Sequence, residues 1–273
     1  MPEGHVIHRL ARVLGDTFIG EPLAISSPQG RFADEAARLD GSELIATEAI
    51  GKHLFLRFDV PGPDYVHIHL GLIGKLHLAP SAPPRGAVRF RIDDGETAAD
   101  LRGPQWCRLV GADVREEVFA TSGPDPIRTD MDPSVGYDRL RRSGKPIAAL
   151  LMDQRIAAGV GNIYRAEVLY RHRLDPDVPG REITAKTWRA IYADLADLMA
   201  DGVRHGRIDT VLDQHTPEAQ GRPARDDPHG GEVYVYRRQG QPCLVCGTEI
   251  RSRLLEGRNL YWCPRCQRRK HAA

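Results

Sequence analysis

The chain has 273 residues, of which 41% are hydrophobic and 27% charged, and its formal net charge at pH 7 is +1. This composition is ordinary for a globular protein, and the length allows two domains with substantial cores. No run of about 18 apolar residues occurs, so no membrane span is predicted. The polar N-terminus lacks the apolar core of a signal peptide, so we expect a cytoplasmic protein.

The chain begins Met1-Pro2-Glu3-Gly4. Methionine is usually removed before a small residue, which would leave Pro2 with a free secondary amine. An α-amino group has a pKa of about 7.7–8, so part of it is unprotonated at neutral pH and able to form a Schiff base. Glu3 would supply an acid beside this amine. Proline is common at the second position, and the motif alone also fits a chain without such chemistry.

The N-terminal half predicts a short helix followed by strands. Residues 3–15 have apolar side chains at near-helical spacing. Residues 54–58, 66–70 and 88–92 are short segments bounded by Gly and Pro, and the last two alternate between apolar and polar side chains. No helix-length pattern separates them, so an antiparallel sandwich is favoured over a parallel sheet. Gly51-Lys52 stands at the entry to the first of these strands.

The pattern then changes at a proline-rich break. Residues 121–133 contain Pro124, Pro126 and Pro133, and they are predicted to form an extended interdomain linker. Helices are predicted at residues 147–155, 163–171 and 184–203. The first two are joined by Gly159-Val160-Gly161-Asn162, a tight turn before a helix N-terminus, where phosphate binds readily. Asn162 would cap that helix, either alone or while also contacting phosphate. Residues 206–232 form a long loop, which is mobile or functional.

The cysteines predict a metal site. Two Cys-x-x-Cys pairs separated by sixteen residues have the spacing of a zinc ribbon, with Cys243, Cys246, Cys263 and Cys266 as the ligands. Four thiolates complete the tetrahedron and leave no position for a substrate, so the sequence predicts one structural Zn²⁺. The remaining cysteine, Cys107, is expected to be a buried apolar residue.

The last 37 residues are strongly basic. From Arg237 onward there are nine Lys or Arg and two Glu, a local excess of seven positive charges. This excess favours contact with a polyanion such as nucleic acid, although a solvated surface would have the same composition. Arg258 follows a glycine between the cysteine pairs, where it would grip a phosphate or simply remain an exposed turn residue.

Six separated motifs resemble, in the correct order, the Fpg/Nei family of bifunctional DNA glycosylases over nearly the whole chain. They are Pro2-Glu3-Gly4, Gly51-Lys52, His69-Leu70-Gly71-Leu72 with Gly74, the linker Gly123-Pro124-Asp125-Pro126, residues 159–167, and the zinc finger with Gly257-Arg258. The Pro-Glu-Gly start and the ending Tyr261-Trp262-Cys263 are more similar to the endonuclease VIII (Nei) branch than to formamidopyrimidine glycosylase (Fpg).

The resemblance implies a multi-domain α+β protein. Residues 1–120 would form a catalytic antiparallel β-sandwich flanked by helices, residues 121–133 a linker, residues 134–232 a helix–two-turn–helix domain with a lesion-side loop, and residues 233–273 a zinc finger. The protein would be a nucleoid-associated monomer that acts on double-stranded DNA containing oxidised bases or abasic sites.

The family's roles transfer to matching positions in this sequence. An amine attacks the sugar C1′ and expels the damaged base, and the resulting iminium allows strand cleavage by β- and δ-elimination. By resemblance, Pro2 is the nucleophile, Glu3 the proton donor, Lys52 a phosphate and sugar contact, Asn162 and Arg258 flanking-phosphate contacts, and Leu72 the residue that fills the gap left by the extruded nucleotide.

Three departures from the family pattern leave the lesion open. Val6 replaces the usual second carboxylate, residues 101–106 replace the Arg-Arg-Phe-Gly loop of the Fpg branch, and residues 212–232 have no obvious lesion-capping counterpart. The Nei resemblance implies oxidised pyrimidines, with purine, bulky or crosslinked lesions as the alternative. Two other interpretations are a non-catalytic zinc protein that binds damaged DNA and an RNA-associated zinc-ribbon protein, which would not explain the N-terminus.

Overall fold

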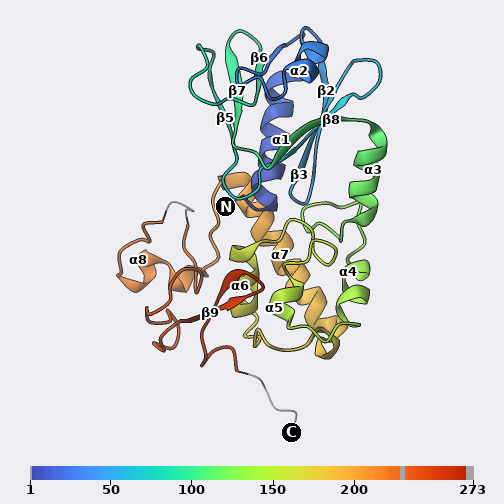
Figure 1. Cartoon of the computed structure of the whole chain (residues 1–273). Helices are drawn as coiled ribbons and strands as arrows, with labels where there is room; N and C mark the ends of the chain where they lie inside the picture. The colour runs from blue at the N-terminus through green and yellow to red at the C-terminus, as the bar shows by residue number, and fades with distance from the viewer. Residues whose placement is uncertain (1, 228–230, 269–273) are drawn as a thin grey trace. The chain divides into compact units, whose positions relative to one another are not determined.

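The computed structural model describes residues 2–227 and 231–268. Met1, whose removal the sequence analysis requires, lies outside these residues, as do the basic-tail residues Arg269 and Lys270. The chain divides into two compact units, Met1–Thr121 and Ser122–Ala273, called unit 1 and unit 2 (Figure 1). Each unit is described by itself.

Unit 1 contains two four-stranded antiparallel sheets. The first has the order β2-β3-β4-β8 and consists of β2 (Leu44–Ile50), β3 (His53–Phe58), β4 (Tyr65–His69) and β8 (Trp106–Val110). The second has the order β1-β6-β7-β5 and consists of β1 (Ala24–Ser26), β6 (Phe90–Asp93), β7 (Thr97–Arg102) and β5 (Lys75–Pro80). Alternate side chains of both sheets enter one apolar core. The predicted antiparallel sandwich is therefore confirmed.

Helix α1 (Gly4–Phe18) completes this core. Its apolar stripe, which includes Ile7, Leu14 and Phe18, is almost fully buried. The helix ends three residues later than predicted because Phe18 continues that stripe. Two further helices belong to unit 1, α2 (Ala33–Leu39) and α3 (Ala112–Thr121). Helix α3 has no buried residue, so it lacks the apolar period that would have predicted it.

Unit 2 is mainly helical. Its α-helices are α4 (Pro133–Leu140), α5 (Ile147–Leu150), α6 (Asn162–Arg171), α7 (Ala185–His205) and α8 (Pro217–Gln220), with 3-10 turns η1 (Gly180–Glu182) and η2 (Asp213–His215). The predicted helices at 163–171 and 184–203 are confirmed, whereas the one at 147–155 is wrong beyond Leu150. The helical hydrogen-bond pattern stops there because the amides of Met152 and Asp153 donate to carbonyls only three residues back, those of Ala149 and Leu150.

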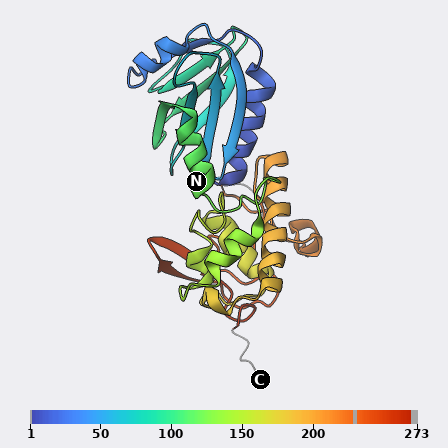
Figure 2. The same ribbon diagram turned by 90° about the vertical axis from the view of Figure 1, so that its right-hand side faces the viewer.

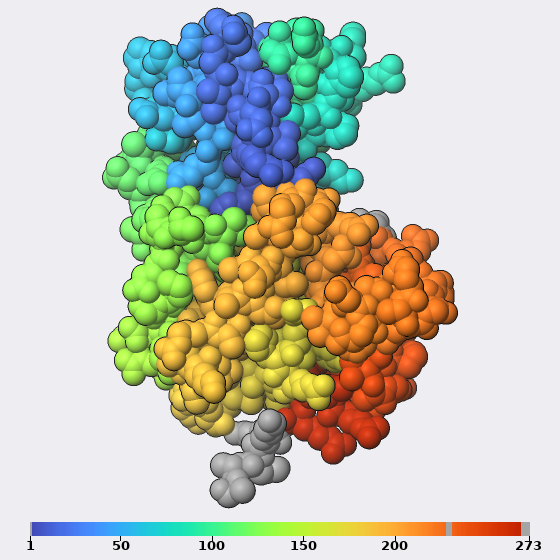
Figure 3. Space-filling model, turned by 180° about the vertical axis from the view of Figure 1, so that it is seen from behind, coloured from blue at the N-terminus to red at the C-terminus, as the bar shows by residue number. Residues whose placement is uncertain are grey.

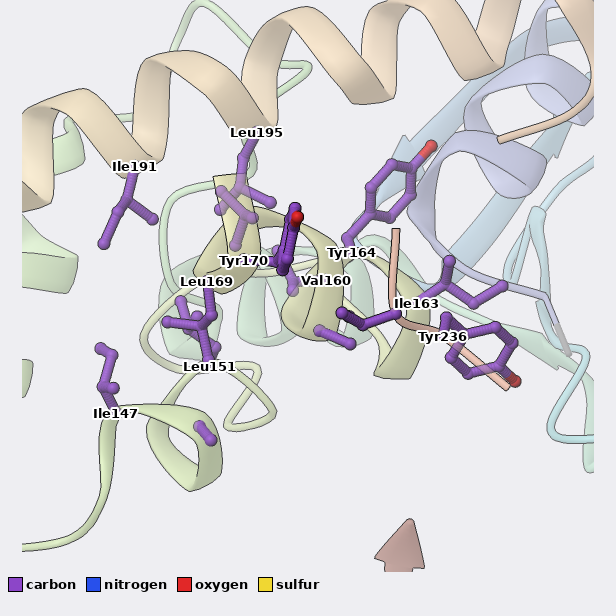
Figure 4. Packing of buried hydrophobic residues seen from close by; sticks show 14 of the residues in the cluster. Ile147, Leu151, Val160, Ile163, Tyr164, Leu169, Tyr170, Ile191, Leu195 and Tyr236 are labelled. Atoms are coloured by element: carbon purple, nitrogen blue, oxygen red, sulfur yellow. The ribbon is translucent and has the colours of Figure 1, made fainter. Parts of the chain in front are cut away.

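The core of unit 2 lies around α6 and α7 (Figure 4). Ile191 and Leu195 of α7 point toward α6, whose Leu169 packs with the side chains around α5 (Figure 4). This core also includes Tyr236 and the cysteine pairs of the finger. The finger and the helices therefore bury apolar surface together.

The proline-rich segment that the sequence suggests as a linker is packed within unit 2. The amide of Gly123 donates to the carbonyl of Gln154 (2.9 Å), and the amide of Ala158 donates to the carbonyl of Pro124 (3.1 Å). Asp125 is fully buried. These contacts hold the segment against the turn that precedes α6.

The finger contains a two-stranded antiparallel hairpin between its two cysteine pairs, β9 (Arg251–Leu255) and β10 (Arg258–Trp262). The hairpin and α7 lie on opposite sides of α6 (Figure 2). The loop that contains α8, in orange, lies beside the red finger (Figure 3). In agreement with this, Gln220 Nε2 of α8 donates to the carbonyl of Leu244 in the finger (3.0 Å). No helix among the described residues is both long and apolar enough to cross a membrane.

A buried carboxylate anchors the segment between this loop and the finger. Glu167 of α6 is fully buried and accepts backbone hydrogen bonds from Tyr234, Val235 and Tyr236 at 2.7–2.9 Å. It also accepts the hydroxyl of Thr210 at 2.7 Å. Four charge-assisted hydrogen bonds therefore join α6 to two distant segments.

Glu167→Gln is expected to lower the free energy of unfolding of unit 2 by about 3 kcal/mol, because the amide places a donor against a backbone donor in a buried site. Urea unfolding of the full chain would measure the loss. The exposed Glu218→Gln in α8 is the matched control and should change stability by no more than about 0.5 kcal/mol. Equal stability of the two variants would contradict the anchoring role.

Candidate active site and metal centre

The start of α1 and the Gly51-Lys52 turn lie at the same end of the first sheet. Thr47 Oγ1 of β2 donates to the carbonyl of Ala11 (2.7 Å), and Ile19 forms a bridge with Leu44. Helix α1 therefore runs antiparallel to β2. From Ala11 back to Gly4 the helix rises about 10 Å, and three residues of β2 beyond Thr47 also advance about 10 Å.

Pro2 and Glu3 occupy the residues immediately before α1. Pro2 is half-buried, whereas Glu3 is 0% exposed. Glu3 is the N-cap residue, with extended backbone, and its carbonyl accepts the amide of Val6 (2.9 Å). Its side chain makes no capping hydrogen bond. Val6 packs against the core, so its position contributes apolar contact where the family pattern has a carboxylate.

Lys52 lies beside a cluster of three imidazoles, of which His67 is buried and His53 and His69 are half-buried, and which was not predicted from the sequence. His53 Nδ1 and His67 Nε2 are 2.9 Å apart, and His69 stacks on Trp106 with ring centroids 4.5 Å apart. Burial lowers the pKa of His53 to about 4 and that of His67 to about 3. Burial, then the Lys52 charge, also lowers the pKa of His69. The alternation His67-Ile68-His69 in a predicted strand was the available sequence signal, because it places both imidazoles on one face of the sheet.

The proposed wedge residue lies in the loop that follows β4. Leu72 is 60% exposed and its neighbour Ile73 is 79% exposed. Two adjacent large apolar side chains in solvent indicate a contact surface. The sequence analysis named Leu72 and missed Ile73. Because β4 ends at His69, opposite His53, this loop is at the same end of the sheet as Lys52.

In unit 2, Asn162 is joined to the zinc-finger hairpin. Its Nδ2 donates to the carbonyl of Asn259 (3.0 Å), the residue after Arg258. Its Oδ1 accepts a hydrogen bond from Arg165. The N-cap residue of α6 is Gly161, so the expected capping role of Asn162 is wrong. The structure thus brings Asn162 into one hydrogen-bonded network with Asn259, the residue next to Arg258.

Arg165 is a buried donor that adds hydrogen bonds to this network. It is 1% exposed and donates to the carbonyls of Ala148 (3.3 Å) and Asn259 (3.2 Å) as well as to Asn162. In the sequence it looks like an ordinary helical arginine, although its spacing of three from Asn162 places both on one face of α6. Its burial follows only from the packed hairpin, which no local pattern reveals.

The four cysteines predicted as metal ligands converge. Their sulfur atoms all lie within 4.8 Å of one another, with pairs at 3.9 Å (Cys243–Cys266) and 3.5 Å (Cys246–Cys263). A tetrahedral zinc with Zn–S bonds of about 2.3 Å requires sulfur separations of about 3.8 Å. The donor set therefore fits one structural Zn²⁺.

Neighbouring groups hold the thiolates in place. Tyr170 Oη of α6 lies 3.0 Å from Cys243 Sγ. Gln267 Oε1 accepts the amide of Cys263 (2.8 Å), and its Nε2 donates to the carbonyl of Leu174 (3.1 Å). The metal site is therefore tied to α6 and the segment after it. Cys107 is buried in the unit 1 core, as predicted, and burial raises the pKa of its thiol.

Comparisons with known proteins agree with this arrangement. Residues 1–105 match the model of the formamidopyrimidine-DNA glycosylase N-terminal domain, residues 122–213 match the formamidopyrimidine-DNA glycosylase H2TH domain, and residues 240–269 match the zinc finger found in FPG and IleRS. Endonuclease 8 1 of Mycobacterium tuberculosis is 48% identical, covering 98% of this chain and all of that protein.

This chain belongs to the Fpg/Nei family. The predicted resemblance is confirmed, and the family's members are DNA glycosylases with AP lyase activity. The formamidopyrimidine-DNA glycosylase of Thermus thermophilus is 32% identical over 98% of both chains. Its crystal structure has a TM-score of 0.75 at 28% identity and covers 97% of this chain and 98% of its own.

The fold also matches a solved DNA complex. A complex of the Lactococcus lactis Fpg with DNA containing an abasic site has a TM-score of 0.78 at 23% identity, over 98% of this chain and all of that one. In this chain, unit 1 contains Pro2, Glu3, Lys52 and Leu72. Unit 2 contains Asn162, Arg258 and the four cysteines.

Mild acid is expected to destabilise unit 1 through His53 and His67. Both have a lowered pKa in the folded state, so below pH 6.5 the unfolded chain binds more protons and stability falls as pH falls. Each histidine should remove about 2 kcal/mol between pH 7 and pH 5. Hydrogen exchange of β3 and β4 peptides, corrected for intrinsic rate, measures this. His67→Phe should reduce the dependence of stability on pH, whereas the control His77→Gln, at an exposed position, should leave that dependence unchanged. Wild-type stability that does not change between pH 7 and pH 5 would contradict the role of His53 and His67.

Removal of zinc is expected to abolish DNA binding while unit 1 stays folded. The hairpin carries Arg258 and the Asn259 carbonyl that holds Asn162, and four thiolates without their metal cannot fix it. A chelator or Cys263→Ser should produce this loss in a fluorescence-anisotropy titration, with zinc content measured in parallel. Cys107→Ala, outside the metal site, should keep both zinc and affinity. Unchanged affinity in zinc-free protein would disprove the clamp role of Arg258.

Proposed function

We propose that this chain is a bifunctional DNA glycosylase and AP lyase that excises oxidised bases, principally pyrimidines, from double-stranded DNA. The observation that carries the proposal is the position of Pro2 and Glu3 at the start of α1, at the same sheet end as Lys52 and the exposed Leu72. This arrangement supplies a nucleophile, an acid, a cation and an apolar wedge in one part of unit 1.

The proposed reaction begins after Met1 is removed, because an acylated proline has no amine lone pair. The Pro2 nitrogen attacks the sugar C1′, and the electrons of the glycosidic bond leave with the damaged base, which takes up the proton that the newly bonded Pro2 ammonium loses. The C1′–O4′ bond then breaks, O4′ takes a proton from Glu3, and an iminium joins Pro2 to the opened sugar. Loss of a 2′ proton expels the 3′ phosphate, the second elimination expels the 5′ phosphate, and water releases the enzyme.

Phosphate contacts hold the strand during this chemistry. The Lys52 ammonium provides a positive charge at the catalytic end of unit 1, and its effect on the His69 pKa indicates that it lies close to β4. Asn162 and Arg258 contribute contacts from the network that joins α6 to the hairpin. Each neutralised phosphate releases counterions, so binding weakens steeply with salt.

Similarity to an endonuclease 8 at 48% identity, against 32% for a formamidopyrimidine-DNA glycosylase, supports oxidised pyrimidines as substrates. The replacement of the Arg-Arg-Phe-Gly loop by residues 101–106 is in line with this choice. The proposed enzyme acts as a nucleoid-associated monomer on duplex DNA with oxidised bases or abasic sites. Solved complexes of Fpg relatives contain such DNA, with an abasic site in one and a carbocyclic 8-oxo-G in another.

Two activities separate the roles of Pro2 and Glu3. Glu3→Gln should lower excision from a duplex containing thymine glycol by about 10²- to 10⁴-fold, because it removes the proton donor. Cleavage of a preformed abasic site should fall less. Pro2→Gly should weaken both activities. The exposed Glu21→Gln is the control and should retain both.

Full activity of Glu3→Gln on thymine glycol would contradict the assigned acid. Wild-type protein with Met1 confirmed absent by mass spectrometry should be active on both DNAs. If it binds them and processes neither, the non-catalytic interpretation replaces the enzyme. If it excises only purine or bulky lesions from a panel of defined duplexes, the pyrimidine preference is wrong.

A further inference from the structure

We propose that His69 and Gln105 are positioning residues that hold the loop carrying Leu72 and Ile73 ready for insertion into the DNA stack. This inference rests on the proposed function of that loop, here called the wedge loop (residues 70–74). It assigns a role to the segment that replaces the Arg-Arg-Phe-Gly loop of the Fpg branch. All the residues involved belong to unit 1.

The wedge loop has a tight backbone that depends on two glycines. Gly71 has φ +67°, and its amide donates to His69 Nδ1 (3.1 Å). The amide of Gly74 donates to the carbonyl of Leu70 (3.0 Å), and a Cβ on Gly74 would lie 2.3 Å from that oxygen. The loop is therefore closed at its base, which leaves the side chains of Leu72 and Ile73 at its exposed tip.

Gln105 fixes His69 on its other side. The Gln105 amide donates to the His69 carbonyl (2.9 Å), and the two side chains are also hydrogen-bonded. A neutral imidazole has one acceptor and one donor nitrogen. Because Nδ1 accepts from Gly71, Nε2 carries the proton and donates to the Gln105 amide oxygen. Stacking of the imidazole on Trp106 holds the plane of the ring.

The turn between β7 and β8 packs directly on the wedge loop. A Cβ on Gly71 would lie 2.9 Å from Gln105 Cβ, so the Gln105 side chain packs directly on the Gly71 backbone. A Cβ on Gly103 would lie 3.8 Å from Ile73 Cγ1. The turn thus packs against the base of the wedge loop. Because the turn is short and contains Gly103, it does not cover Leu72 and Ile73 at the exposed tip.

This support matters for DNA that must be unstacked. Extruding a nucleotide costs a few kcal/mol, which inserted apolar side chains partly offset. A loop that is ordered before binding loses less conformational entropy when it inserts. Contacts with phosphates of undamaged duplex do not require insertion. The positioning role therefore predicts an effect on lesion processing that is separable from non-specific DNA affinity.

The test combines Gln105→Met with removal of the wedge. Methionine keeps the length and the packing on Gly71 but cannot accept the His69 proton. Single-turnover excision of thymine glycol from duplex DNA should fall about 3- to 10-fold, the value of one hydrogen bond. The Kd for undamaged duplex should stay unchanged. In a Leu72→Ala/Ile73→Ala background, Gln105→Met should have no further effect, because the element it positions is gone.

Each outcome distinguishes the two proposals. If Leu72→Ala/Ile73→Ala excises thymine glycol at the wild-type rate, the wedge function itself is wrong. If that double variant is impaired but Gln105→Met is not, the positioning role is overturned while the wedge remains. The positioning role is also overturned if Gln105→Met lowers excision equally in both backgrounds or weakens binding to undamaged duplex, because these results indicate a general structural defect.

Discussion

The packing of α1 against β2 is the contact on which the proposed chemistry depends. A terminal amine has no fixed position unless the residues after it are held, and here Ile7, Leu14 and Phe18 are buried from the first turn of the helix to its last. The hydrogen bond from Thr47 to the Ala11 carbonyl sets the register of the helix on the strand. The same register that buries an apolar stripe therefore directs Pro2 toward the sheet end that carries Lys52.

Unit 2 depends on a second constraint, the convergence of four sulfur atoms. The hairpin of residues 251–262 has little core of its own, and two-stranded hairpins alone are marginal in water. The metal site, Tyr170 and Gln267 join this hairpin to α6, so Arg258 and Asn162 share one rigid support. Arg165 lies beneath both and donates to the Asn259 carbonyl and to Asn162. The proposed phosphate binding by Asn162 and Arg258 therefore depends on the metal site through this arrangement.

Features that depend on spacing along the chain could be predicted from sequence, and features that depend on distant partners could not. The cysteine pairs and the stripe of α7 around Trp188 are local patterns, and both are confirmed. The proline-rich segment 121–133 is predicted as an extended interdomain linker; residues 123–126 pack within unit 2 because Gly123 and Pro124 bond to a turn some thirty residues away. His69 and Arg165 looked ordinary, because their roles arise from a loop and a hairpin that only the fold brings to them.

The central claim is that the amine of Pro2 is the nucleophile, and covalent trapping tests it most directly. Borohydride should reduce the iminium formed between the protein, with Met1 removed, and duplex DNA containing an abasic site or thymine glycol. The account predicts a stable protein–DNA adduct whose N-terminal peptide carries the modification on Pro2. An adduct mapped to Lys52, or no adduct from correctly processed protein that binds the DNA, would contradict it.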